Sequence, residues 1–161
     1  MGDTRAGRLE ARFDRLDRDA NGFVERRDYE TIPARLAEAI GERNEGVRRL
    51  EAAYLALWDR LRGERDADGD GRISRAEFVE AATNTLSDDD AYDRWLRPIV
   101  DAYVQALDRD GDGRLGTSEL AAIGKSTGVA EHDVEAALGL ADADHDGLLS
   151  AEELHALVEA F

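Results

Sequence analysis

Cysteine is absent from this chain of 161 residues. A disulfide framework, a zinc–thiolate site and thiol chemistry are therefore excluded. The sequence also has no apolar stretch near the roughly 20 residues that span a membrane, and its first residues lack the apolar segment of a secretory leader. We therefore expect a cytoplasmic protein with no membrane partner.

Basic residues are in the minority, with 21 lysines and arginines against 37 aspartates and glutamates and a formal net charge of −16. Such a chain repels nucleic-acid phosphates and anionic lipids, so we expect no nucleic acid and no membrane as partners. Patterns typical of enzymes are also missing, since there is no glycine-rich phosphate loop, nucleophile elbow or catalytic triad. We expect a monomer that is not an enzyme, and the sequence indicates no particular protein partner.

The acidic residues that dominate this composition form a repeated pattern. Four segments, at residues 17–28, 66–77, 108–119 and 142–153, contain D-x-[DN]-x-[DN]-G with a further acidic residue six positions after the glycine. A calcium ion needs roughly 6–8 oxygen ligands at about 2.3–2.6 Å, and a twelve-residue EF-hand loop with this spacing wraps around the ion to supply them. Because the pattern occurs four times, the sequence predicts a calcium-binding protein with three to four sites.

The predicted ligands of each loop are the side chains at positions 1, 3, 5 and 12 and the backbone carbonyl at position 7. The glycine at position 6 permits a backbone turn that a side chain would obstruct. These predicted metal ligands are Asp17, Asp19, Asn21, Phe23 and Asp28; Asp66, Asp68, Asp70, Arg72 and Glu77; Asp108, Asp110, Asp112, Arg114 and Glu119; and Asp142, Asp144, Asp146, Leu148 and Glu153.

The first loop departs from the pattern at position 12, where Asp28 replaces glutamate. Aspartate is one methylene shorter, so we expect it to reach the ion with one oxygen, which favours six-fold coordination and Mg²⁺. Glu25 at position 9 can partly compensate. The alternative is a degenerate loop that holds no metal, and calcium, magnesium and no ion all stay open at this point.

Each loop carries an apolar residue at position 8, and these residues are Val24, Ile73, Leu115 and Leu149. Two loops lying back to back bury such residues in a short two-stranded link. We therefore expect an all-α fold of four helix–loop–helix units in two pairs, with short antiparallel β-links between paired loops. The predicted division is an N-terminal pair at residues 1–86 and a C-terminal pair at residues 87–161, packed as one compact unit.

Apolar residues at helical spacing flank every loop, as expected for amphipathic helices. We interpret the large aromatic side chains among them as core residues rather than as the lining of a groove for a partner helix. They are Tyr54, Trp58, Trp95 and Tyr103.

The three histidines and Pro33 can also be interpreted from the sequence. His132, His145 and His155 do not cluster with one another or with a nucleophile, so we interpret them as solvated surface residues. Pro33 follows the first loop, where we expect it to kink or interrupt a helix.

The whole chain resembles the sarcoplasmic calcium-binding protein group of four-EF-hand proteins and its calerythrin-type bacterial relatives. The resemblance rests on the order of the loops, the long gap between the first two, and the segment ARFDRLDRDANGFVERRDYE with its closing Asp28. It implies a compact all-helical fold and a role in calcium buffering or homeostasis. The familiar bacterial relative has a disabled second loop, whereas loop 66–77 is intact here. Arginine supplies every basic residue except Lys125, which is typical of GC-rich bacterial genes.

Two non-enzymatic functions remain open, a calcium buffer that only holds ions and a sensor that exposes an apolar surface to a partner. Sensors of the calmodulin kind open a methionine-rich groove, because methionine packs adaptably against many partners. Met1 is the only methionine here. The sequence therefore favours an intracellular calcium buffer, with a sensor as the alternative.

Overall fold

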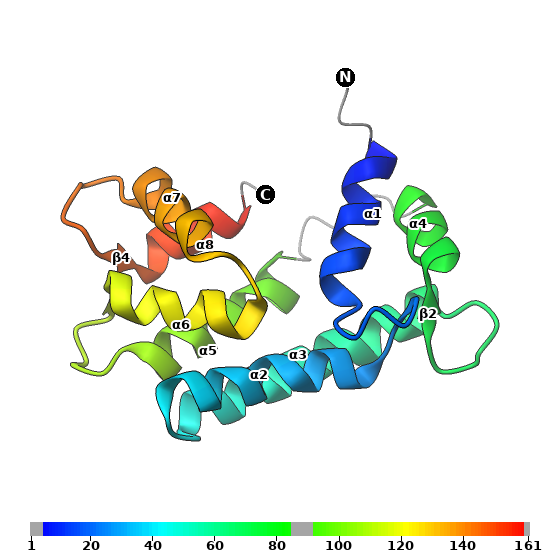
Figure 1. Ribbon diagram of the computed structural model, residues 1–161, viewed down its shortest axis with the longest axis horizontal. Coiled ribbons are helices and arrows are strands. Elements are labelled where there is room, and N and C mark those ends of the chain that lie inside the picture. Colours follow the sequence, from blue (N-terminus) through cyan, green and yellow to red (C-terminus); the bar gives the residue numbers. More distant parts are fainter. Residues whose placement is uncertain (1–4, 85–91, 160–161) are drawn as a thin grey trace. The chain divides into compact units, whose positions relative to one another are not determined.

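The computed structural model describes residues 5–84 and 92–159, which form helices joined by loops and two short sheets (Figure 1). The helices are α1 (Arg5–Leu16), α2 (Arg26–Ile40), α3 (Glu45–Arg65), α4 (Arg75–Asn84), α5 (Arg97–Leu107), α6 (Thr117–Thr127), α7 (Glu131–Ala141) and α8 (Ala151–Glu159). A π-helical turn, η1 (Tyr92–Leu96), precedes α5. The strands are β1 (Phe23–Val24), β2 (Ile73–Ser74), β3 (Arg114–Leu115) and β4 (Leu149–Ser150). The predicted fold of four helix–loop–helix units is confirmed.

The loops pair through the short strands that they contain. Strand β1 pairs with β2 and β3 with β4, both antiparallel, so that the position-8 residues face each other as Val24 with Ile73 and Leu115 with Leu149. All four side chains are buried. The predicted association of the first loop with the second and of the third with the fourth is therefore confirmed.

Contacts divide the chain into two compact units. The first comprises Met1–Thr31 and Tyr54–Asp89, and the second Ile32–Ala53 and Asp90–Phe161. Each unit contains one pair of loops, and the second half of α2 and the beginning of α3 belong to the second unit. The predicted boundary between residues 86 and 87 lies outside the described residues, so it stays a prediction, as does the packing of the pairs into one compact body.

The core of the first unit is built from aromatic and branched side chains. Phe13 of α1 meets Phe78 of α4 edge to face, with ring centroids 5.6 Å apart, and Tyr29 lies 5.6 Å from Trp58. Complete burial of such a side chain stabilises the fold by about 1.5–3 kcal/mol. Helices α1 and α4 pack together over this core, which also contains Val24 and Ile73 from the two loops of the pair.

The second unit is held by α5, which packs against α6 and α8, while α7 packs against both of these. Its buried apolar side chains include Val100, Tyr103, Leu107, Leu120 and Leu154. The interpretation of the aromatic residues as core is confirmed for Trp58 and Tyr103, which are buried. Tyr54 and Trp95 are half-buried.

The corner between α2 and α3 is fixed to the end of α5, within the second unit. Asn44 caps α3, because its Oδ1 accepts a hydrogen bond from Val47 N at 3.0 Å, and its Nδ2 donates to Ala106 O at 2.9 Å. A Cβ added to Gly46 would lie 2.3 Å from Ala106 N. Arg109, at position 2 of the third loop, donates to Ile40 O at 3.1 Å. The corner therefore contacts the chain where α5 enters the third loop.

The two prolines differ in their effect on the helices. Of the two outcomes expected at Pro33, a kink or an interruption, the interruption does not occur, because Pro33 lies inside α2, which continues to Ile40. Its ring is fully buried, and this packing offsets the lost backbone hydrogen bond. Pro98 lies in the first turn of α5, where a missing N–H costs little. Within the described ranges, no helix is long and apolar enough to cross a membrane.

Candidate metal centres

Each loop begins on the last turn of the preceding helix. The backbone N–H of the first aspartate donates to the carbonyl four residues earlier, at 2.8 Å for Asp17 and Asp108, 2.9 Å for Asp142 and 3.0 Å for Asp66. The carboxylate of the same aspartate accepts a bond from the position-6 glycine at 2.8–3.0 Å in all four loops. These bonds close each loop around its acidic side chains.

Two positions in each loop have left-handed backbone geometry. The position-6 glycines have φ between +78° and +87°, as expected for the turn. Position 4 is also left-handed, and there the loops differ: Gly69 and Gly111 occupy it in the second and third loops, but Ala20 (φ +54°) and His145 (φ +59°) in the first and fourth. A side chain in this region costs about 1–2 kcal/mol, so the first and fourth loops carry strain that the motif did not reveal.

The predicted carboxylate ligands converge in four groups whose oxygens lie within 4.8 Å of one another. In the second and third loops the groups contain positions 1, 3 and 5, and in the first and fourth they contain positions 1, 3 and 12. The groups are Asp17, Asp19 and Asp28; Asp66, Asp68 and Asp70; Asp108, Asp110 and Asp112; and Asp142, Asp144 and Glu153. Among the predicted carboxylates, Glu77, Glu119 and Asp146 lie outside these groups.

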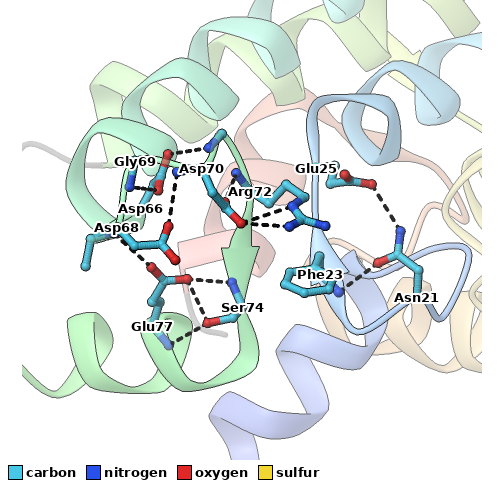
Figure 2. Close-up of polar contacts among 12 residues, drawn as sticks. Asn21, Phe23, Glu25, Asp66, Asp68, Gly69, Asp70, Arg72, Ser74 and Glu77 are labelled. Atoms are coloured by element: carbon cyan, nitrogen blue, oxygen red, sulfur yellow. Dashed lines mark hydrogen bonds and ion pairs between the residues drawn. The ribbon is translucent and has the colours of Figure 1, made fainter.

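The donors in these groups fit a hard divalent cation, because all of them are oxygens. In the first loop, Asn21 completes the predicted set at position 5, with its Oδ1 accepting from Phe23 N at 2.8 Å and its Nδ2 donating to Glu25 Oε2 at 3.0 Å (Figure 2). The predicted ligation by position-7 carbonyls stays a prediction.

The position-12 carboxylate accepts hydrogen bonds from positions 2 and 9 of its own loop. Glu77 accepts from Ala67 N at 3.0 Å and from Ser74 N at 2.8 Å, and Ser74 Oγ also donates to it at 2.7 Å (Figure 2). The Ser74 hydroxyl and backbone N–H hold the pKa of Glu77 below its ordinary value. Ser150 lowers the pKa of Glu153 in the same way, first through its N–H and then through its hydroxyl.

Asp28 makes the equivalent connection in the first loop with a shorter side chain. Its oxygens accept from Arg18 N at 3.1 Å and from Glu25 N at 2.7 Å. The side chain is only 3% exposed, and burial raises the pKa of Asp28, although the two backbone bonds oppose the shift. In the first loop, positions 2 and 9 are thus bridged by a buried side chain that is one methylene shorter than the glutamate of the other loops.

Side chains at position 7 connect the loops of a pair. Arg72 lies over the ring of Phe23 at 4.2 Å and also pairs with Asp70 of its own loop, at 2.8 Å from Nη2 (Figure 2). In the other pair, Arg114 of the third loop forms an ion pair with Asp146 of the fourth. The spacing of the motif predicts only the carbonyls at these positions and gave no indication of these side-chain contacts.

One of the three histidines is not the surface residue that we expected. His155 is 9% exposed, and its Nε2 lies 2.9 Å from Asp101 Oδ1 of α5. It is buried because α8 packs against α5, a contact between segments distant in the sequence. His132 and His145 are exposed, as predicted.

Comparison with known proteins places these loops in a family context. The EF-hand family model matches residues 66–81, 99–123 and 134–158, leaving the first loop unmatched. Calerythrin from Saccharopolyspora erythraea is 31% identical over 96% of this chain and 89% of its own length.

Solved structures of calcium-binding proteins are also similar to this chain. A Streptomyces coelicolor calcium-binding protein, whose structure is described as a structural basis for prokaryotic calcium-mediated regulation, is 31% identical with a TM-score of 0.82 over 96% of both chains. The photoprotein berovin from the ctenophore Beroe abyssicola, in its Ca²⁺-loaded apoprotein state, is 26% identical with a TM-score of 0.77, over 96% of this chain and 86% of its own.

Proposed function

This chain belongs to the calerythrin-like EF-hand calcium-binding proteins, and we propose that it acts as an intracellular calcium buffer with no enzymatic activity of its own. Calcium binding follows from the family. The buffering role goes further, and one observation carries it: the chain has four nearly complete ligand sets but no methionine beyond Met1 for an adaptable target groove. Its buried apolar positions are filled by leucine, isoleucine, valine and aromatic residues of defined shape.

The ligand sets support calcium at the second, third and fourth loops. Each combines four carboxylates at positions 1, 3, 5 and 12, and a glutamate at position 12 can supply both of its oxygens. In the described loops, Glu77, Glu119 and Glu153 are already held by backbone N–H groups of their own loop. Glu153 already lies in the carboxylate group of its loop, and Glu77 and Glu119 need only turn inward to reach an ion.

At the first loop we propose Mg²⁺ or weaker Ca²⁺ binding. Asp28 lies within 4.8 Å of Asp17 and Asp19 and bridges the loop with its shorter side chain. A tighter cavity with one oxygen from position 12 suits the octahedral coordination and shorter bonds of Mg²⁺. Calorimetric titration with Ca²⁺, with and without Mg²⁺, tests this assignment: Mg²⁺ should remove the heat of one Ca²⁺ site and leave the others.

A second function, calcium sensing, is supported by an apolar pocket in the second unit. The pocket has a volume of about 150 Å³ and lies among α6, α7, β4 and α8. Ile123, Val134 and Leu138 contribute to its lining, and Val129 at its edge is 43% exposed. Calcium could widen such a pocket for a partner, as sensor EF-hands do. The Streptomyces coelicolor relative is described in terms of calcium-mediated regulation.

Hydrophobic-dye binding distinguishes the buffer from the sensor. For a buffer, dye fluorescence should stay flat or fall when calcium is added to the metal-free protein, because no new apolar surface is exposed. For a sensor, it should rise steeply near micromolar calcium. Replacing Leu138 with Glu in the pocket provides the control, since a rise that depends on the pocket must disappear in this variant. A clear rise from the folded, monodisperse wild-type protein would overturn the buffer proposal.

A further inference from the structure

In the second, third and fourth loops, the position-5 carboxylate uses one oxygen to accept a hydrogen bond from its own backbone. Asp146 Oδ1 accepts from Leu148 N at 2.8 Å, and Asp112 Oδ1 accepts from Arg114 N at 2.8 Å. The equivalent bond in the second loop joins Asp70 Oδ1 to Arg72 N at 2.9 Å. Since Oδ1 accepts a backbone hydrogen bond in all three loops, Oδ2 is the oxygen that the loop backbone leaves for a cation.

In the fourth loop, that second oxygen is paired with a guanidinium from the neighbouring loop. Arg114 Nη1 donates to Asp146 Oδ2, across the β3–β4 link. In the third loop, Asp112 Oδ2 has no such partner among the described contacts, although Arg114 is two residues away. The arginine of the third loop thus engages the carboxylate of the fourth loop instead of its own.

The grouping of the carboxylates also differs between the third and fourth loops. Asp112 belongs to the cluster of the third loop, whereas Asp146 is absent from the cluster of Asp142, Asp144 and Glu153. Asp70, which pairs with Arg72 of its own loop, stays in the group of the second loop, whereas Asp146, whose arginine partner lies in the neighbouring loop, is outside the group of its own loop. Binding of an ion at the fourth loop then requires Asp146 Oδ2 to leave the guanidinium or to share its charge with it.

We propose that Arg114 is an affinity-determining residue that lowers the calcium affinity of the partner loop, by occupying the Asp146 oxygen that the ion needs. The inference rests on the proposed binding of calcium at the fourth loop. Arg72 has the corresponding effect within its own loop, because both its Nε and Nη2 donate to Asp70 Oδ2, at 3.2 and 2.8 Å (Figure 2). In the first pair, the position-7 arginine therefore lowers the calcium affinity of its own loop, the second. In the second pair, the position-7 arginine of the third loop lowers the calcium affinity of the fourth.

The size of the effect follows from the exposure of the pair. The side chains of Arg114 and Asp146 are 43% and 30% exposed. Ion pairs of this exposure change an equilibrium by at most about fivefold and are screened by salt. Removing the guanidinium should therefore raise the calcium affinity of the fourth loop about two- to fivefold at low ionic strength, and less in about 1 M salt, where the screening length is about 3 Å.

Arg114→Gln tests the proposal, with Arg72→Gln as the matched control because it changes the same loop position and the same net charge. Calcium is added to ¹⁵N-labelled full-length protein, and the amide signals of Gly71, Gly113 and Gly147 report their own loops. A Glu119→Gln background weakens the third loop, so that coupling between the paired sites does not obscure the result. Circular dichroism verifies that each variant is folded.

The expected result is a separation between the two variants. Arg114→Gln should lower the calcium concentration at the midpoint of the Gly147 amide titration and leave the Gly71 midpoint unchanged. Arg72→Gln should lower the Gly71 midpoint and leave the Gly147 midpoint unchanged. Arg114→Lys should retain most of the wild-type midpoint, because it keeps the charge. An unchanged or higher Gly147 midpoint in Arg114→Gln overturns the proposal, and so does an equal shift at Gly71, which would indicate a general effect of net charge. If the Gly147 signal of the wild-type protein does not respond to calcium, binding at the fourth loop fails first, and the inference fails with it.

Discussion

At the scale of single residues, position 12 separates the first loop from the others. Asp28 and Glu77 accept hydrogen bonds from the same two loop positions, 2 and 9, but Asp28 does so with one methylene fewer. Burial raises the pKa of Asp28, whereas hydrogen bonds from Ser74 lower that of Glu77. The first loop therefore holds its closing carboxylate in a more enclosed environment that disfavours its charged form.

Replacing Asp28 with Glu tests how this side chain selects the ion. The longer side chain can present both oxygens, so we expect calcium affinity at the first loop to rise about tenfold and the preference for Mg²⁺ to fall. The measurement is a calcium titration followed at the Gly22 amide, repeated in the presence of Mg²⁺. Asp28→Asn, which keeps the size and removes the charge, should weaken both ions. If the first loop of the unmodified protein proves to be the tightest calcium site, the coordination argument is wrong.

Ser150 provides a test of how the position-12 carboxylates respond to pH in the absence of metal. The pKa of Glu153 is lower in the folded chain than its ordinary value of 4.5, because Ser150 donates to it. The Ser150 hydroxyl therefore stabilises the folded state above about pH 4.5, and this stabilisation is lost as the pH falls through the folded-state pKa.

We expect Ser150→Ala to lower the free energy of unfolding near pH 6, with an effect that shrinks as the pH is lowered toward 3 and Glu153 becomes protonated. Urea unfolding in the presence of chelator measures the difference. Ser74→Ala should behave in the same way through Glu77. A destabilisation that is equal at both pH values would indicate lost packing rather than a lost bond to the carboxylate.

At the scale of elements, two glycines of the same helix should respond in opposite ways to replacement by alanine. Gly46, near the start of α3, lies so close to Ala106 that a Cβ would meet backbone atoms at 2.3–2.7 Å, whereas nothing lies within 4 Å of a Cβ at Gly63. We expect Gly46→Ala to destabilise the fold by about 1–3 kcal/mol and Gly63→Ala to stabilise it by about 0.4–1 kcal/mol. Urea unfolding of both variants checks this, and equal effects would contradict the close approach of α3 to α5.

The elements that sequence reasoning located best are those specified locally. The ligand spacing places the loops, and the apolar periodicity beside them places the helices. The pairing of loops follows from Val24, Ile73, Leu115 and Leu149, because an apolar residue in an acidic loop needs a partner.

The features that sequence reasoning missed depend on distant contacts or on backbone geometry. The burial of His155 requires α5 beside α8, a contact between segments distant in the sequence. The contact of Arg114 with Asp146 becomes visible only when two loops 34 residues apart lie back to back. The left-handed geometry at Ala20 and His145 had a weak signal, since glycine occupies the same position in the other two loops.

At the scale of the whole molecule, charge links metal binding to folding. Fifteen of the 37 acidic residues occupy positions 1, 3, 5 and 12 of the loops, and four divalent ions, with eight positive charges, would reduce the formal charge from −16 to −8. Carboxylate oxygens lie within 4.8 Å of one another in each of the four groups, so that they repel one another when no cation lies between them. Their repulsion disfavours the folded state, and an ion that binds only the folded state stabilises it by mass action.

Chelation of metal should therefore lower the melting temperature and the helicity of the protein. A site held at about 100 times its dissociation constant contributes about 2.7 kcal/mol, so filling even one such site should move the melting temperature by several degrees for a chain of this size. Differential scanning calorimetry in calcium and in chelator measures the shift. Salt then separates the two causes: about 1 M potassium chloride should recover part of the loss in chelator, because it screens carboxylate repulsion, but cannot replace bound calcium. If salt restores the melting temperature completely, charge repulsion alone explains the fall caused by chelator. A melting temperature that does not change with chelator would contradict the link between metal binding and folding.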